Sequence, residues 1–126
     1  MRLVLAAVLS AALLLMAATP GLAGPAEPGF VPGVEDLPLM PGLTAPANDA
    51  IVFDQPEGRI VESAARGDVS ADAITAFYTQ TLPQLGWRPA GPGRWAREGE
   101  RLEITATRDG AGRQAETMVR FVLRPQ

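Results

Sequence analysis

Arginine is the residue of this chain whose type and spacing offer the most chemistry. Residues 73–126 contain eight arginines and five acidic residues, whereas residues 24–72 contain two arginines and nine acidic residues. A guanidinium group donates paired hydrogen bonds to carboxylates and phosphates, so an arginine-rich half could bind an anionic ligand or glycan. The candidates are Arg94, Arg97, Arg101, Arg120 and Arg124, of which Arg101 and Arg120 are the first to test.

Acidic side chains alternate with these arginines, which offers two further interpretations. Interleaved charges of both signs are also typical of an ordinary solvated sheet face. Alternatively, a pair of carboxylates could hydrolyse a glycoside, with the pair drawn from Asp54, Glu57, Glu98, Glu100 and Glu103. A chain of this length seldom encloses the large cleft that such substrates occupy, so a small carboxylate-dependent hydrolase is the least favoured alternative.

Cysteine, histidine and lysine are all absent from the sequence. Their absence removes an imidazole general base, a thiolate nucleophile and a Schiff-base amine. It also removes the usual ligands of zinc and other transition metals. We therefore expect no catalytic residue, no cofactor and no metal site. We expect no nucleic-acid partner either, because the formal net charge is -3.

The first 23 residues have the pattern of a secretory signal peptide. Arg2 precedes an apolar segment from Leu3 to Ala18, and the small residues Gly21 and Ala23 follow. The apolar segment is shorter than the ~20 residues that a membrane-spanning helix needs, and no cysteine is present for a lipid anchor. We predict cleavage after Ala23 and a periplasmic or secreted protein with no stable membrane anchor after cleavage.

Residues 24–49 form a proline-rich extended lead-in, because prolines at this density prevent a regular helix. Its first part is expected to be a disordered tether. Its second part, the strap of residues 36–43, carries four large apolar side chains, namely Leu37, Leu39, Met40 and Leu43. The strap either packs over the core or docks as a peptide in a partner's groove.

Residues 50–126 have the patterns of an α+β domain. The runs 51–53 and 59–64 flank a Pro-Gly turn and predict a hairpin, which Arg66-Gly67-Asp68 would end through turn chemistry. Ser70 is a good N-cap for a helix that ends near Gly86, and its apolar face would comprise Ile74, Phe77, Tyr78, Leu82 and Leu85. Period-two patterns then predict strands at 87–89, 94–98, 101–108 and 115–124.

The predicted order β-β-α-β-β-β-β indicates a two-layer sandwich, with one helix packed on an antiparallel sheet. Pro89 predicts that its strand lies at an edge of the sheet. Two tryptophans have two open interpretations. Trp87 and Trp95 either close the edge of the core or stand exposed as a recognition surface.

Three segments resemble those of small exported bacterial proteins of unknown function: residues 36–43, 53–62 and 77–87. The resemblance implies work outside the cytoplasm and carries no catalytic residue. Export, the small size, the expected edge strands and the lack of catalytic side chains favour a non-enzymatic binding or assembly module of the cell envelope, with a protein partner. The oligomeric state stays open at this point.

Overall fold

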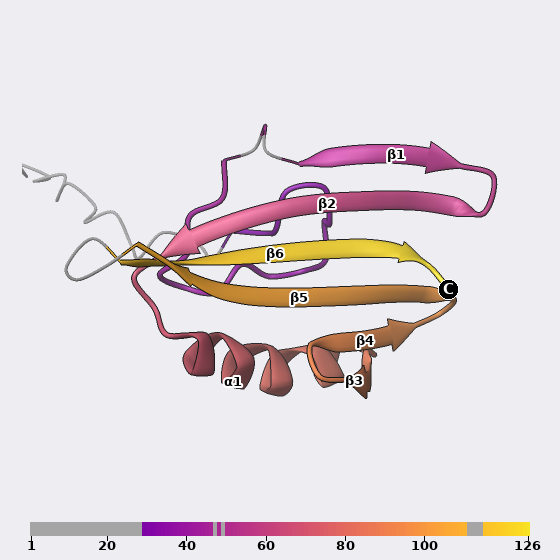
Figure 1. The fold of residues 1–126 in the computed structure, drawn as a ribbon. Helices are drawn as coiled ribbons and strands as arrows, with labels where there is room; N and C mark the ends of the chain where they lie inside the picture. The colour runs from indigo at the N-terminus through magenta and orange to yellow at the C-terminus, as the bar shows by residue number, and fades with distance from the viewer. Residues whose placement is uncertain (1–28, 47, 49, 111–114) are drawn as a thin grey trace, which may run out of the picture.

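The computed structural model describes residues 29–46, 48, 50–110 and 115–126, which form an antiparallel sheet covered on one face (Figure 1). Along the chain the elements are β1 (Ile51–Gln55), β2 (Gly58–Gly67), α1 (Ala71–Thr81), the 3-10 helix η2 (Leu82–Leu85), β3 (Arg88–Gly91), β4 (Arg94–Arg97), β5 (Glu100–Asp109) and β6 (Glu116–Pro125). The strands lie in the order β1-β2-β6-β5-β4-β3. This arrangement confirms the predicted two-layer α+β fold.

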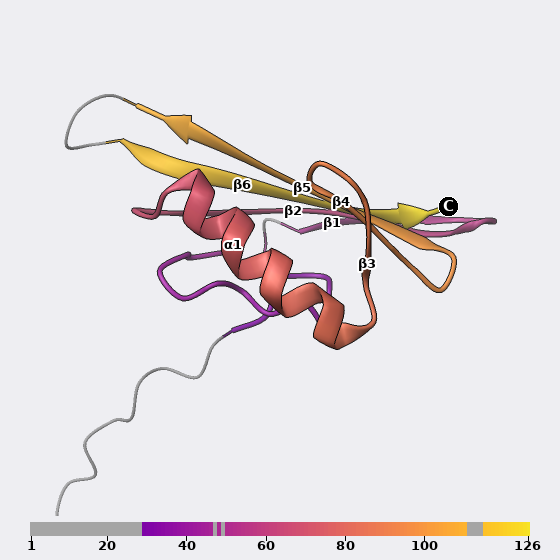
Figure 2. The same cartoon turned by 90° about the horizontal axis from the view of Figure 1, so that it is seen from below.

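The core lies on one face of the sheet because apolar side chains alternate in register on the three central strands. Val61 of β2 lies opposite Leu123 of β6, and Leu123 lies opposite Leu102 of β5. All three side chains are buried. The intervening residues point to the other face, which neither the helix nor the N-terminal segment covers (Figures 1 and 2).

Helix α1 begins and ends as its sequence predicts. The main-chain N–H of Ala73 donates to the Ser70 side chain at 3.0 Å, which caps the first turn. Ile74 and Tyr78 on its inner face are buried. The helix tightens into η2, which contains Pro83, and ends at Gly86 with a left-handed φ of 89°.

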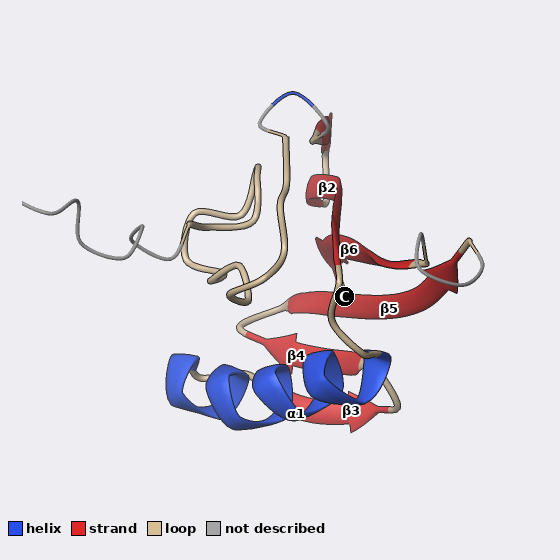
Figure 3. Ribbon diagram, turned by 90° about the vertical axis from the view of Figure 1, so that its left-hand side faces the viewer, coloured by secondary structure: helices blue, strands red, loops and turns tan. Residues whose placement is uncertain are grey.

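The N-terminal segment, residues 29–46, lies on the same face of the sheet as α1 (Figure 2). In the view along the strands, this segment lies beside β2 and β6, whereas α1 lies beside β4 and β3 (Figure 3). Four of its side chains are buried in the core: Val31, Val34, Leu37 and Leu43. Leu39 and Met40 pack partly buried against the same core. The strap is thus packed in this structure, as one of its two interpretations proposed.

Hydrogen bonds and an ion pair fasten the N-terminal segment to the sheet and the helix. Thr44 and Arg66 exchange main-chain hydrogen bonds at 2.8 and 3.0 Å. The Tyr78 hydroxyl of α1 donates to the carbonyl of Pro38 at 2.9 Å. The carboxylate of Asp36 lies 2.7 Å from the guanidinium of Arg97. The segment therefore completes the helical layer of the fold.

Gly67 corrects one detail of the predicted hairpin. The second strand does not end before Arg66-Gly67-Asp68, because β2 continues to Gly67. A Cβ atom at Gly67 would lie 2.1 Å from the carbonyl oxygen of Gly42. The glycine is therefore required by the close approach of the N-terminal segment to β2, in addition to any turn chemistry.

Pro89 lies in β3 at one edge of the sheet, as predicted. The predicted signal peptide, its cleavage site after Ala23 and the first residues of the lead-in lie outside the described residues. Within the described part of the chain, no helix is long and apolar enough to cross a membrane.

Candidate functional site

Six of the candidate interaction residues lie in the core or pack against it. The structure buries Leu37, Leu43, Trp87 and Trp95 and leaves Leu39 and Met40 partly buried against them. The two tryptophans close the edge of the core beneath β3 and β4, since Trp95 faces the helix from β4 and Trp87 follows η2. None of these side chains is presented to a partner in this conformation. The surfaces that remain are the open sheet face and the sheet edges.

The guanidinium of Arg97 is occupied by contacts within the protein, so Arg97 is no longer a candidate for anion binding. Its guanidinium lies 4.3 Å from the centre of the Trp87 ring, pairs with Asp36 and donates to the carbonyl of Leu85 at 3.0 Å. Because residues two apart on a strand share a face, Arg97 lies on the same side of β4 as the buried Trp95. The group has a structural role between η2, β4 and the strap.

The open sheet face brings other arginines together. Arg101 on β5 lies directly opposite Arg124 on β6, and Arg94 on β4 lies opposite Glu103. Like charges directly opposite one another in a sheet are destabilising. No salt bridge joins Arg101 or Arg124 to a carboxylate of the described residues. An anion bound between the two guanidinium groups would relieve this repulsion.

Arg88 was not among the sequence candidates, yet it lies in the same row as Arg101 and Arg124. Its register partner on β4 is Ala96, which in turn lies opposite Arg101. One row of register partners thus crosses the face in the order Arg88, Ala96, Arg101 and Arg124. We call the three arginines of this row the arginine cluster. No local sequence pattern could predict this row, because it depends on the order of strands in the sheet.

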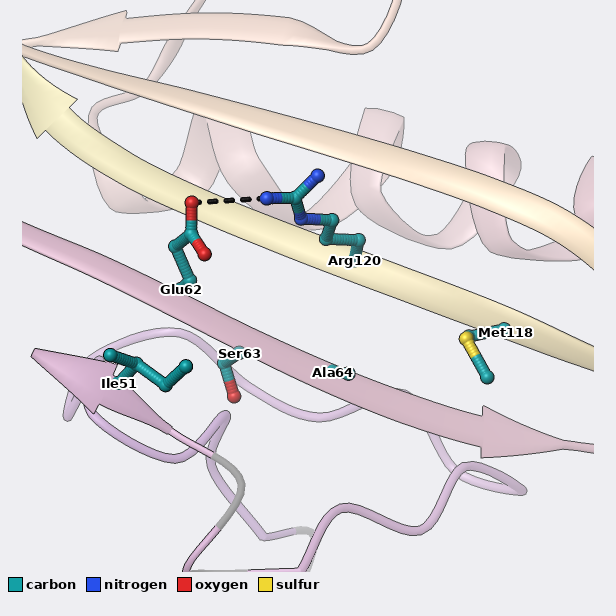
Figure 4. A pocket seen from close by; sticks show the side chains of 6 residues that line it. All are labelled: Ile51, Glu62, Ser63, Ala64, Met118 and Arg120. Carbon is teal, nitrogen blue, oxygen red and sulfur yellow. Dashed lines mark hydrogen bonds and ion pairs between the residues drawn. The ribbon is translucent and has the colours of Figure 1, made fainter.

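Arg120 does not join Arg101, although the two were the candidates to test together. Arg120 lies opposite Ala64 on β2 and forms an ion pair of 3.0 Å with Glu62 (Figure 4). Beside this pair is a shallow hollow of about 200 Å³ on the open face. Its lining residues are Ile51, Glu62, Ser63, Ala64, Met118 and Arg120. The small side chain of Ala64 leaves this space between longer neighbours.

The carboxylates proposed for hydrolysis are distributed over the sheet. Asp54 and Glu57 belong to β1 and its turn, whereas Glu98, Glu100 and Glu103 belong to β5 and the turn before it. Two strands, β2 and β6, lie between these groups, which separates them by about 14 Å at the usual strand spacing. Within the residues that the structure describes, no group of three or more acidic side chains could hold a metal ion.

The free edge of β1 exposes three successive large apolar residues, which the sequence did not single out as a site. The exposed fractions are 51% for Ile51, 46% for Val52 and 50% for Phe53. These residues were predicted as a strand, but their exposure follows from the position of β1 at the end of the sheet. The sequence signal was a short β-branched and aromatic run before a turn, which is equally typical of a buried strand.

The two edges of the sheet differ in how they are protected. β3 has only four residues, contains Pro89 and carries a register shift between Pro89 and Gly91. Proline and irregular pairing are the devices by which proteins prevent strand addition at an edge. β1 has no proline and pairs regularly with β2 through all five of its residues. The unprotected edge is therefore the apolar one.

Every second residue of β1 directs its main-chain groups away from the sheet. The N–H and C=O of Arg66 bond to Thr44 on the β1 side of β2. Because these groups alternate sides along a strand, those of Glu62 also face β1, where Ile51 is its partner. The neighbouring residue of β1, Val52, therefore directs its N–H and C=O outward. β1 therefore exposes apolar side chains together with main-chain donors and acceptors to which another strand could bind.

Comparison with protein-family profiles, with curated proteins and with solved structures found no match. The resemblance to small exported bacterial proteins therefore stays a prediction. The open sheet face and the edge of β1 are the two candidate binding surfaces of the described residues.

Proposed function

We propose that this protein is an exported, non-enzymatic binding or assembly module of the cell envelope that associates through strand addition at β1. The observation that carries the proposal is the exposed run of Ile51, Val52 and Phe53 at an edge without proline or bulge. An added strand would gain main-chain hydrogen bonds from β1 and apolar contacts from its side chains. The predicted signal peptide supports the location.

The absence of cysteine, histidine and lysine from the sequence supports a role in binding. The hollow beside Arg120 also supports it, because glycoside hydrolysis requires a pair of carboxylates and only one, that of Glu62, lines this hollow. Packing of the strap and of both tryptophans leaves β1 as the principal exposed apolar surface described above.

Site-specific photo-crosslinking in the producing cell tests this function. A photoreactive phenylalanine analogue at Phe53 is expected to crosslink to an extended segment of a protein, identified by mass spectrometry of the joined peptides. The same analogue at Thr79, an exposed position on α1, is the control. Equal crosslinking from both positions, or none from position 53, would contradict the proposal.

Val52→Pro and Val52→Thr separate strand addition from simple apolar contact. Proline removes the outward N–H of residue 52 without removing a bond to β2, whereas threonine keeps this donor and the β-branched shape. Strand addition predicts that the crosslink from position 53 is lost in Val52→Pro and kept in Val52→Thr. A crosslink that survives in both variants would show that the edge donor is not used.

A second candidate function is binding of an anionic ligand by the arginine cluster, favoured by the direct opposition of Arg101 and Arg124. The double variant Arg101→Ser/Arg124→Ser should lose binding of polyphosphate or a sulfated oligosaccharide in a titration at low salt. The double variant Arg66→Ser/Arg108→Ser, which removes two exposed arginines elsewhere on β2 and β5, is the matched control. Equal weakening in both variants would indicate only general charge attraction.

A further inference from the structure

We infer that the strand added at β1 is β1 of a second copy of this chain, in antiparallel pairing about a two-fold axis at Val52. The inference rests on the proposed function, because it names the partner of the same edge. It is carried by the self-complementarity of residues 50–54, which comprise Ala50 and the first four residues of β1. Isologous pairing of this kind closes on itself and leaves no further free copy of the edge.

Hydrogen bonding fixes where the two-fold axis can lie. Val52 directs its main-chain N–H and C=O outward, and so does Asp54, two residues further along. With the axis at Val52, each Val52 exchanges two hydrogen bonds with the partner's Val52. Asp54 then pairs in the same way with the partner's Ala50. The outward donors and acceptors of the strand are thus matched by an identical strand.

The same register matches the apolar side chains. Ile51 lies opposite the partner's Phe53, and Phe53 lies opposite the partner's Ile51, both on the open face. These are non-hydrogen-bonded pairs, in which the side chains approach most closely. Val52 meets its own copy on the opposite face. All three residues that β1 exposes are therefore covered by one pairing.

Neighbouring registers are less favourable. An axis at Asp54 places two carboxylates directly opposite one another, which is destabilising. An axis at Phe53 places Val52 opposite the partner's Asp54 and Ile51 opposite the partner's Gln55. With the axis at Val52, Asp54 instead faces the partner's Ala50 and keeps Arg59 as its register partner within the chain. The charges of β1 therefore select the same register as its apolar residues.

The pairing joins the two sheets edge to edge. The arginine cluster of each copy then lies on one continuous open face. An interface made of one strand edge is small compared with that of a permanent dimer. We therefore expect a reversible dimer whose fraction rises with protein concentration.

Single-cysteine variants test the register directly, because the natural chain contains no cysteine. In hydrogen-bonded antiparallel pairs the Cα atoms lie about 5.5 Å apart, within the range that a disulfide bridges. Val52→Cys should form a disulfide-linked dimer under mild oxidation. Asp54→Cys is the register control, because the two copies of residue 54 would lie roughly 13 Å apart along the strands.

Ala90→Cys, at an exposed position of the protected edge strand β3, controls for random collision. The protein recovered after expression of the full chain is used, and circular dichroism checks that each variant is folded. We expect dimer formation from Val52→Cys to be at least ~10-fold faster than from either control. Equal rates for the three variants would overturn the inference.

Sedimentation of the unmodified chain provides the second measurement. The wild type and Val52→Thr should show a dimer fraction that rises with concentration, and Val52→Pro should remain monomeric. If the wild type stays monomeric, the inference that the added strand comes from a second copy of this chain is overturned. The proposed function would still stand if position 53 then crosslinks to another protein, and it fails separately if position 53 crosslinks to nothing.

Discussion

The Tyr78 hydroxyl donates a hydrogen bond to the carbonyl oxygen of Pro38 at 2.9 Å, which joins α1 to the strap across 40 residues of sequence. The same oxygen accepts a hydrogen bond of 3.3 Å from the main-chain N–H of Met40. The ring lies edge-on to Phe77 and to Phe121 of β6, with centroids 4.9 and 5.7 Å away. One side chain thus connects the helix, the sheet and the N-terminal segment.

Tyr78→Phe should destabilise the protein by about 1–3 kcal/mol. The substitution keeps the ring and its packing but leaves the Pro38 carbonyl and the Met40 N–H without their partner. Equilibrium unfolding in urea measures the change. Thr75→Ala, which removes an exposed hydroxyl from the same helix, is the control and should change stability much less. Equal effects of the two substitutions would contradict the assigned role.

Alkaline pH should destabilise the protein through this one residue. Burial raises the pKa of Tyr78 from 10.0 to about 12, so the folded state holds the phenolic proton more tightly than the unfolded state. The resulting stability, roughly 2–3 kcal/mol, is fully present below pH 10 and is lost as the pH rises through 12.

The alkaline experiment reports on Tyr78 in particular, because the sequence has one tyrosine, no cysteine and no lysine. The free energy of unfolding should therefore fall between pH 10 and 12 in the wild type and stay nearly level in Tyr78→Phe. The absorbance of tyrosinate should rise over the same interval. A similar fall in both proteins would assign the transition to another cause.

Local patterns were sufficient to predict the elements of this fold. Ser70 and the spacing of Ile74 and Tyr78 predicted α1, because capping and a 3.6-residue period act within a few residues. Pro89 predicted an edge strand because it lacks a main-chain donor. Arg97 could also have been assigned correctly, since the period of two places it on the same face as Trp95.

The candidate sites depend on pairings between distant segments, which local patterns do not contain. β6 lies between β2 and β5, and this order alone places Arg124 opposite Arg101. The same order leaves β1 at an edge, with Phe53 exposed. The apolar composition of the strap predicted that it would be covered, but its partners in the core, such as Tyr78, follow from the tertiary structure.

Leu37→Ala tests whether the strap is part of the folded core. Leu37 is completely buried, so its truncation should cost about 2–5 kcal/mol in the free energy of unfolding. Phe30→Ala is the control, because Phe30 lies in the same segment with 59% of its surface exposed. Urea unfolding of both variants should show a large loss for Leu37→Ala only. A free docking peptide would instead give two small and similar effects.

Gly67→Ala should separate the N-terminal segment from β2. The new Cβ would meet the Gly42 carbonyl oxygen at 2.1 Å and the Leu43 Cα at 3.2 Å, and both are main-chain atoms that cannot rotate away. We expect a loss of at least about 1–3 kcal/mol and faster hydrogen exchange at the N–H groups of Thr44 and Arg66. Gly29→Ala, at a position with open space around it, should change neither quantity.

Arg97 and Asp36 should contribute unequally, although they form the shortest ion pair of the described residues. Half of the Asp36 side chain is exposed, so Asp36→Asn should cost no more than about 1 kcal/mol. Arg97→Ala should cost about 1–3 kcal/mol, because it also removes the contact with the Trp87 ring and the hydrogen bond to Leu85. Arg97→Lys keeps the charge but lacks the planar group that covers the ring, so urea unfolding should give it an intermediate stability. If Asp36→Asn and Arg97→Ala were equally destabilising, the ion pair alone would account for Arg97, and its contact with Trp87 would contribute nothing.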